Sequence, residues 1–395
     1  MNTYTQITAV TGMNIRSLPQ RLGTSSVIVI GIAGVVAVFV SVLAMSTGIV
    51  KTLSNSGRDD RAIVVRTGSS SELTSNLQQA AGLTIADAAG VRRGADGKPL
   101  ASAEGVRIVN LVRTDGLEAN APIRGITSQG LAMRSEFKLI EGRMFTPGVN
   151  ELVIGRAAQR IYRDSKVGQV LDVNDATWTI VGVFESGGDS HESELLTDAD
   201  TSNSAFRRGN SFQSMTVQLD SPEAYETFRN AITTNPSLQV EVKREREFYQ
   251  AQTKTISNIL SIVAYVVGGI MAVGALFGAL NALYSAVSTR AREIATLRAI
   301  GFGSTAVVVS VFVEALVLAL LGGLIGAALA WLVFNGHAVN TSGGGLGGQL
   351  VFDLTVTPKL IAIGVVGACS LGLLGGLLPA IRAARLPIAT ALRAV

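Results

Sequence analysis

Apolar residues in this chain are gathered into four long stretches that carry almost no charge. The first runs from Leu22 to Val50 and the second from Thr255 to Thr289. The third, Thr305–Phe334, is interrupted only by Glu314, and the fourth, Leu360–Ile381, is uncharged throughout. Because about 20 apolar residues in a helix cross the ~30 Å hydrocarbon core of a bilayer, each stretch predicts a transmembrane helix.

Between the first two stretches the pattern changes to short runs typical of β-strands. Strands are predicted at 61–67, 105–113 and 150–155, and residues 169–184 predict a hairpin that turns at Asn174-Asp175. Residues 211–242 then predict a strand, a helix that begins at Ser221-Pro222, and another strand. The segment is therefore predicted to be an α+β domain inserted between the first and second membrane helices.

Arginines flank these spans on one side only. The lead into the first span carries Arg16 and Arg21. The segment between the second and third spans carries Arg290, Arg292 and Arg298, and the end of the chain carries Arg382, Arg385 and Arg393. Residues 335–358 hold Asp353 and no Lys or Arg. Since Lys and Arg collect in cytoplasmic loops, all three basic segments are predicted to be cytoplasmic and the inserted domain extracytoplasmic.

The predicted fold class is thus a membrane α-helical protein with four spans, both termini in the cytoplasm, and an inserted α+β domain. The expected division along the chain is an amphipathic lead (1–24), a first span (25–48), an extracytoplasmic domain (49–256), a stalk and second span (257–286), a cytoplasmic segment (287–304), a third span (305–334), a short outer loop (335–358), a fourth span (359–381) and a cytoplasmic tail (382–395).

The amino-acid composition is typical of a membrane protein and argues against a soluble or nucleic-acid-binding protein. Only 16% of the 395 residues are charged, against about 25% in average soluble domains. The net charge of +4 includes no long basic run, so nucleic acid is not an expected partner. Cys369 is the one cysteine, which excludes an internal disulfide bond.

No motif for catalysis or metal binding is found. Lys98 in GADGKPL (94–100) is followed by Pro99, so this loop is not a Walker A motif and we expect no ATP hydrolysis by this chain alone. His191 and His337 lack metal-ligand spacing. The chain is therefore predicted to be non-catalytic and to bind no metal or cofactor directly. The acidic run 185–200 could bind a cation or a basic partner, but it lacks the order of a calcium loop and is predicted to be a solvated loop.

The spans contain two further features. Glycines recur at four-residue spacing, which lets helices approach closely in lipid; the pairs are Gly274 and Gly278, Gly322 and Gly326, and Gly372 and Gly376. Glu314 lies near the cytoplasmic end of the third span. For this carboxylate we favour a structural role over a proton or substrate role: it can extend to the membrane interface or pair with an arginine of the preceding loop.

Four stretches resemble the MacB/FtsX-like permease superfamily of ABC transporters. They are NIRSLPQRLGTSSVIVIGIAG (14–34), EGRMFTPGVNELVIGRAAQRIYRDSKVGQVLDVNDATWTIVGVFE (141–185), STRAREIATLRAIGFGSTAVVVSVFVEALVLALLGGLIG (288–326) and GLLPAIRAARLPIATALRAV (376–395). The chain departs from the family pattern at Ala295, where Gly is usual, at Thr390, where Glu is common, and before Pro387, where Asp is missing.

The resemblance implies a stand-alone permease subunit in a bacterial inner membrane. It would pair with a second permease copy, as a homodimer or a related heterodimer, and dock on a dimer of a separate ATPase that binds ATP and Mg²⁺. ATP hydrolysis would move the spans and the outer domain, a mode called mechanotransmission. This movement would drive export of a lipid, lipoprotein, peptide or drug, with a periplasmic adaptor and an outer-membrane channel as further partners.

The resemblance also assigns ATPase coupling to residues 288–301. The residues concerned are Arg290, Arg292, Glu293, Ile294, Leu297, Arg298 and Gly301. In a helix, Ile294, Leu297 and Arg298 would form one stripe that fills a groove in the ATPase, as in helix-in-groove recognition. The alternative is that the arginines serve membrane topology alone.

A different function for the whole chain also stays open. The same architecture occurs in FtsX-like regulators, which activate an envelope enzyme such as a cell-wall hydrolase. The outer domains of those regulators are generally smaller than the segment inserted here, so export is the preferred hypothesis.

Overall fold

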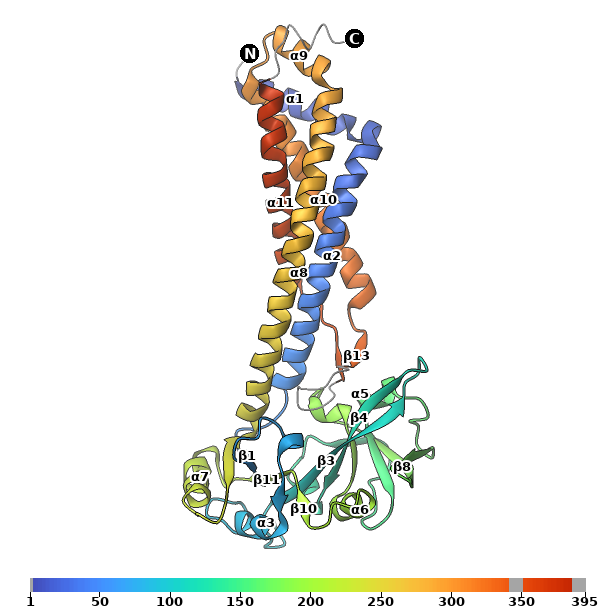
Figure 1. Ribbon diagram of the computed structural model, residues 1–395, viewed down its shortest axis with the longest axis vertical. Helices are drawn as coiled ribbons and strands as arrows, with labels where there is room; N and C mark the ends of the chain where they lie inside the picture. The colour runs from blue at the N-terminus through green and yellow to red at the C-terminus, as the bar shows by residue number, and fades with distance from the viewer. Residues whose placement is uncertain (1–2, 341–350, 386–395) are drawn as a thin grey trace. The chain divides into compact units, whose positions relative to one another are not determined.

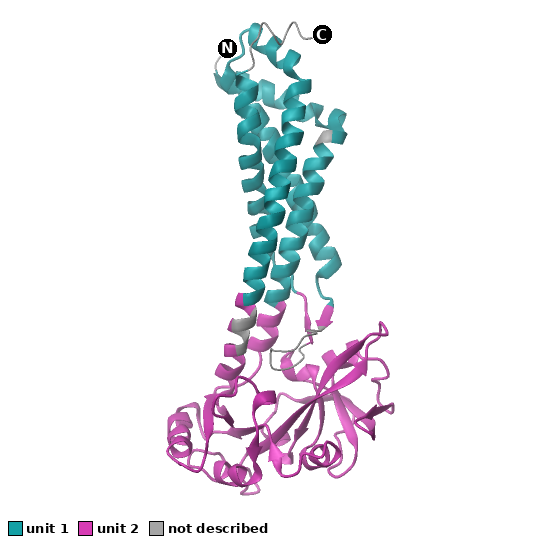
Figure 2. Ribbon diagram, in the orientation of Figure 1, with its two compact units in different colours: residues 1–47, 259–337, 355–395 teal, residues 48–258, 338–354 magenta. Residues whose placement is uncertain are grey.

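The computed structural model describes residues 3–340 and 351–385. The chain forms two compact units (Figure 2). The first, called the helical unit, consists of Met1–Thr47, Ile259–His337 and Thr355–Val395. The second, called the inserted domain, consists of Gly48–Asn258 and Ala338–Leu354. The middle of the predicted outer loop (341–350) and the tail from residue 386, with Pro387, Thr390 and Arg393, lie outside the described residues.

Among the described residues, four helices are long and apolar enough to cross a membrane, as predicted (Figure 1). They are α2 (Leu22–Ser54), α8 (Glu245–Thr289), α10 (Ser304–Phe334) and α11 (Pro358–Ala384). Two shorter helices accompany them, namely α1 (Thr3–Ser17), which leads through the 3-10 turn Leu18–Arg21 into α2, and α9 (Ala291–Ala299), which lies between α8 and α10.

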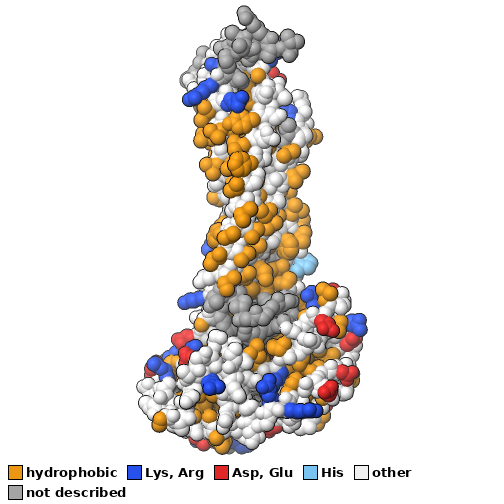
Figure 3. All heavy atoms as spheres, viewed as in Figure 1, with side chains coloured by type: hydrophobic (Ala, Val, Ile, Leu, Met, Phe, Trp, Pro, Cys, Tyr) orange, Lys and Arg blue, Asp and Glu red, His pale blue; other side chains and the backbone are white. Residues whose placement is uncertain are grey.

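The helical unit buries many alanines together with larger apolar residues, and it leaves many large apolar side chains exposed. Its core includes Ala44, Ala319, Ala327 and Ala368. Many Leu, Ile and Val side chains of α8, α10 and α11 are exposed, and apolar side chains cover much of this unit on the face shown in Figure 3. Small residues at helix contacts together with an apolar exterior are the pattern expected of helices packed in lipid.

The inserted domain is built on a mixed ten-stranded sheet. The main path of the sheet runs β12-β1-β11-β3-β4-β9-β6-β8-β5, and β7 pairs with β8. The strands are β1 (Arg61–Arg66), β3 (Ala101–Val112), β4 (Glu118–Ile126), β5 (Lys138–Gly142), β6 (Glu151–Gly155), β7 (Val170–Val173), β8 (Ala176–Glu185), β9 (Leu195–Asp198), β11 (Ser214–Gln218) and β12 (Val240–Arg244). Two small pairs complete the set, namely β2 (Leu77–Gln78) with β10 (Ser211–Phe212) and β13 (Ala338–Asn340) with β14 (Val351–Asp353).

Short helices cover this sheet, and the described residues of the domain form several apolar cores, of which two are large. One core gathers β1, β11 and β12 with α3 (Gln79–Ala86) and α7 (Tyr225–Thr233), and includes Phe228. The other gathers β4, β6, β8 and β9 with α5 (Arg156–Ile161) around Trp178. The remaining elements are α4 (Ser128–Ala132), α6 (Ala199–Ala205) and the 3-10 turns η2 (Glu72–Thr74), η3 (Ser190–Ser193) and η4 (Pro222–Ala224).

The predicted hairpin and the strand–helix–strand order are confirmed. Strand β7 pairs with β8, and Val173 lies opposite Ala176. Asn174 and Asp175 have φ of 52° and 60°, the left-handed pair that a two-residue type I′ turn needs and that Asn and Asp tolerate. Ser221 precedes η4, which opens with Pro222 and leads into α7, although the Ser221 side chain makes no capping hydrogen bond.

Candidate functional site

Helix α9 joins the second and third membrane helices. Arg290 stands at its N-cap, Glu293 lies in its first turn and Arg298 in its last. An acid at the N-terminus and a base at the C-terminus both interact favourably with the helix dipole. After Ala299 the chain leaves the helix at Gly301, whose φ of +101° is accessible to glycine and costly for other residues.

One face of α9 is buried against its own chain. Ile294, only 4% exposed, packs in a cluster with Val287, Val307, Val311, Ala380 and Ala383, which come from α8, α10 and α11. Ala295 is also buried, and Leu297 and Arg298 are half-buried. The exposed residues are Arg292, Glu293, Thr296, Ala299 and Ile300. The Ile294 side chain therefore packs inside the bundle, which corrects the prediction that it fills a groove in the ATPase. The other side of α9 is the exposed one.

Polar groups from four elements meet beside α9. Arg290 donates to Glu314 of α10 at 3.3 Å and to Glu293 at 3.1 Å. It also donates to the side chain of Asn14 in α1. Arg21 lies 3.8 Å from Glu293 and 4.0 Å from Glu314. The expected pairing of Glu314 with an arginine of the preceding loop is present. Since the Glu314 side chain is only 6% exposed, this pairing compensates a carboxylate that would otherwise be costly to bury.

The glycine pairs differ in what they approach. A Cβ added at Gly322 or Gly326 would lie 2.9 Å from Val29 O or 2.4 Å from Ala33 O of α2. A Cβ at Gly372 or Gly376 would lie 2.4 Å from the Ala319 side chain or 2.7 Å from the Ala315 side chain of α10. A Cβ at Gly274 or Gly278 would meet no atom within 4 Å. Two of the three pairs therefore allow close helix packing within the chain.

Replacing Gly326 by alanine is expected to destabilise the helical unit, because the new methyl group collides with the α2 backbone and forces the helices apart. We expect a loss of about 1–3 kcal/mol. Gly278→Ala is the matched control and should be neutral or slightly stabilising, since alanine is the better helix former by ~1 kcal/mol. Thermal unfolding in detergent measures both variants, and equal midpoints would contradict the close α2–α10 contact.

The middle of the acidic segment 185–200 is buried, which corrects the prediction of a solvated loop for that part, while Asp200 is exposed. Asp189, His191, Glu192 and Glu194 are each less than 10% exposed. Glu194 pairs with both the Nε and Nη2 atoms of Arg124, at 2.7 and 2.8 Å. Leu195–Asp198 then continues as β9 in the sheet. Three of its acids, Asp189, Glu192 and Glu194, are thus part of the domain interior.

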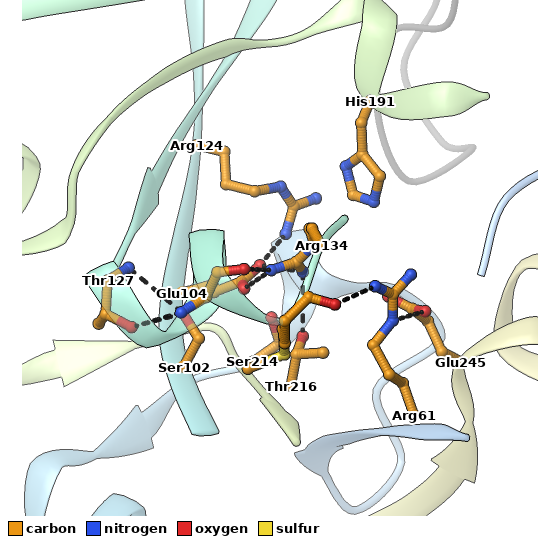
Figure 4. A network of polar contacts seen from close by, with 12 residues as sticks. Arg61, Ser102, Glu104, Arg124, Thr127, Arg134, His191, Ser214, Thr216 and Glu245 are labelled. Atoms are coloured by element: carbon orange, nitrogen blue, oxygen red, sulfur yellow. Dashed lines mark hydrogen bonds and ion pairs between the residues drawn. The ribbon is translucent and has the colours of Figure 1, made fainter. Parts of the chain in front are cut away.

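Arg124 lies at the centre of a charge network inside the inserted domain (Figure 4). It donates to Glu72 at 2.9 Å and to Glu104 at 2.8 Å, in addition to Glu194. Arg134 donates to Glu104 at 2.7 Å. Burial alone would raise the pKa of Glu194, but the charges of Arg124 and His191 hold it far below its usual range. The network therefore keeps several buried charges in mutually compensating pairs.

His191 of η3 extends this network toward α8. Its Nδ1 lies 3.1 Å from Glu194 Oε2 and its Nε2 lies 3.5 Å from the Tyr249 hydroxyl. Burial alone would lower the pKa of His191, but the Glu194 carboxylate raises it above its usual value. Burial raises the pKa of Asp189 to about 6.

Three chain segments that continue into membrane helices are anchored in this part of the domain. After α2, the Ser56 hydroxyl accepts from the Ser190 backbone N–H at 2.9 Å. At the start of α8, Glu245 accepts from Arg61 Nε at 2.7 Å and from the Arg58 backbone N–H at 3.0 Å. Before α11, the Val351 backbone N–H donates to the Ser193 hydroxyl at 2.9 Å. The turn η3 thus bonds directly to two of these segments.

The fold defines a class, namely a membrane protein with four apolar helices and a large α+β domain between the first and second. Family models give the particular family. Residues 22–235 match a MacB-like periplasmic core domain and residues 265–388 match an FtsX-like permease C-terminal region. The chain belongs to the MacB/FtsX-like ABC transporter permease family.

Relatives agree with this assignment. The macrolide export ATP-binding/permease protein MacB of Rhodopirellula baltica is 25% identical over 93% of this chain and 59% of its own length. The uncharacterized ABC transporter permease YknZ of Bacillus subtilis is 25% identical over 98% of this chain and 97% of its own. Among solved structures, the periplasmic region of MacB from Actinobacillus actinomycetemcomitans aligns with 51% of this chain and 96% of its own at 14% identity and a TM-score of 0.38. The chain spans about three fifths of the R. baltica protein.

Proposed function

We propose that this chain is the permease subunit of a bacterial ABC exporter and that α9 receives the movement of a separate ATPase. The observation that carries the proposal is the two-sided character of α9. Ile294 and Arg290 fix one side to the bundle, while Arg292, Thr296 and Ile300 of the other side are exposed. Ile300 is 68% exposed although it is a large apolar residue, and such residues next to charges favour a protein partner.

The distribution of arginines supports a cytoplasmic position for α9. The same rule places the inserted domain outside the membrane, so the site of ATP hydrolysis and the domain that handles cargo lie on opposite sides. Movement then has to pass along the membrane helices. The proposed mechanism is mechanotransmission, in which two permease copies and two ATPase subunits assemble in the inner membrane.

The proposed cargo is a lipid, lipoprotein, peptide or drug that is delivered outside the membrane. The name of the MacB relative, a macrolide export protein, supports export over regulation of an envelope enzyme. A periplasmic adaptor and an outer-membrane channel complete this proposal. Cargo transport by the whole assembly, with no effect on cell-wall hydrolysis, is the result that separates export from the regulator.

Copurification tests the role of α9. The tagged permease is coexpressed with each stand-alone ABC ATPase of the same genome, and the retained ATPase and its rate of ATP hydrolysis are measured. Arg292→Glu and Ile300→Asp change the exposed side of α9 without removing the Arg290–Glu314 pair. We expect each to weaken ATPase binding roughly tenfold or more, as hot-spot changes do.

Leu117→Asp is the matched control, because Leu117 is a similarly exposed apolar residue, 63% exposed, in the inserted domain. It should leave ATPase binding unchanged. Unchanged binding and unchanged ATP hydrolysis in both α9 variants would contradict docking at α9 and favour a purely topological role for its arginines.

A further inference from the structure

Helix α1 carries polar side chains on the face that packs against the helical unit. Val10 and Asn14 are buried and Gln6 is half-buried, whereas Tyr4 and Met13 are 73% and 59% exposed. An ordinary surface helix would turn its polar side chains to solvent. Here the buried Asn14 and the half-buried Gln6 have specific partners, and those partners lie at the two ends of α9.

The C-terminal end of α9 is held by Gln6. The link from α9 to α10 contains Gly301 and Gly303, and a Cβ added at Gly301 would meet nothing within 4 Å, so side-chain packing does not support the link there. The Gln6 Oε1 atom accepts from the Gly303 backbone N–H at 2.9 Å. Its Nε2 atom donates to the Gly301 carbonyl oxygen at a longer 3.5 Å. The side-chain amide of Gln6 therefore bonds to both glycines of the link.

The N-terminal end of α9 is held by Asn14. Its Oδ1 atom accepts from Arg290, the N-cap residue of α9, and its Nδ2 atom donates to the Ser310 hydroxyl of α10. The Ser310 hydroxyl also donates to the Val10 carbonyl oxygen at 3.4 Å. Arg290 in turn reaches Glu314 of α10. Asn14 thus joins three helices at one buried point.

We propose that α1 is a brace and that Gln6 and Asn14 are positioning residues, which hold both ends of α9 against α10. This inference rests on the proposed function, since it says how force from an ATPase at α9 reaches the membrane. A short link with two glycines can absorb displacement by rotating its backbone. With the brace in place, a displaced α9 carries α10 with it as a rigid body.

The distance between spin labels on α9 and α10 tests this proposal without any ATPase. Thr296 of α9 is exposed and Leu321 of α10 is 45% exposed, so both accept labels after Thr296→Cys and Leu321→Cys in a Cys369→Ser background. The full chain is measured in lipid nanodiscs by double electron–electron resonance. Gln6→Ala and Asn14→Ala should each broaden the distance distribution, and the double variant should broaden it most. Gln20→Ala, the same change at an exposed position beside α1, is the matched control.

Coupling is measured in the same variants. Each brace variant should retain the ATPase on copurification, because the exposed side of α9 is intact. Stimulation of ATP hydrolysis by the permease should fall roughly fivefold to tenfold per variant, in line with the loss of one or two hydrogen bonds. A general folding defect would instead lower ATPase retention and the thermal midpoint together.

The two proposals fail separately. Distance distributions that stay as narrow as in wild type overturn the brace, whatever the ATPase does. Broadened distributions with unchanged stimulation also overturn it, because the link would then be free without loss of coupling. If wild-type permease retains no ATPase, the proposed function fails while the distance measurement still reports on the contacts of α1.

Discussion

Arg124→Ala is expected to unfold the inserted domain or to lower its stability by about 3–5 kcal/mol, which is what removal of one partner from a buried ion network costs. The side chain of Arg124 is 2% exposed and faces Glu72, Glu104 and Glu194. Without it, three carboxylates are left close together with Arg134 and His191 as the nearest cations. The loss comes from the burial of uncompensated charge, since no large apolar contact is removed.

The fluorescence of Trp178 can measure the stability of the inserted domain in the Arg124→Ala variant. Trp178 is fully buried in the core around β8, and the other tryptophan, Trp331, is in α10. In a Trp331→Phe background, fluorescence during urea unfolding of the full chain therefore follows the inserted domain. Arg156→Ala is the control, because Arg156 pairs with Glu185 while 57% exposed, and such pairs contribute ~1 kcal/mol or less. Equal losses of unfolding free energy in the Arg124→Ala and Arg156→Ala variants would contradict a structural role for the Arg124 network.

Arg290→Ala is expected to have the second largest effect, a loss of about 3 kcal/mol in the helical unit. The Glu314 carboxylate would keep only the more distant Arg21 as a cation. Glu314 would lose its ion pair with Arg290 at 3.3 Å, and Asn14 would lose the hydrogen bond that it accepts from Arg290. The thermal midpoint of the permease in detergent should fall, and coupling through α9 should fall with it, because α9 loses its attachment to α10.

A double variant separates charge burial from other causes. If the loss comes from an uncompensated Glu314, adding Glu314→Ala to Arg290→Ala should recover most of the midpoint, as neighbouring residues in one network are not additive. A double variant that is less stable than Arg290→Ala would show that Arg290 acts by packing or membrane orientation instead.

The membrane spans and several strands could be predicted because their signals are local. Uncharged stretches such as Leu22–Val50 need no partner to be recognised. The turn at Asn174-Asp175 is likewise specified by the residues that tolerate left-handed backbone. The family resemblance rested on longer matches of the same local kind.

The buried network could not be predicted because its members meet only in the sheet. Arg124, Glu104 and Glu194 come from β4, from β3 and from the residue before β9, and these strands are neighbours only once the sheet has formed. Six acids within 185–200 therefore looked like a solvated loop. Similarly, the stripe of Ile294, Leu297 and Arg298 was predicted to fill a groove in the ATPase, whereas Ile294 packs inside the bundle. The spacing along one helix does not indicate which face of that helix contacts its own chain.

The two-part construction of the inserted domain bears on how the protein is made. Val351, at the start of β14, is part of the core around Trp178 and bonds to Ser193 of η3. The ribosome synthesises this residue only after α8, α9 and α10, long after residues 48–258 have emerged. The domain must therefore cross the membrane with that part of its core open and close it after the third span is inserted.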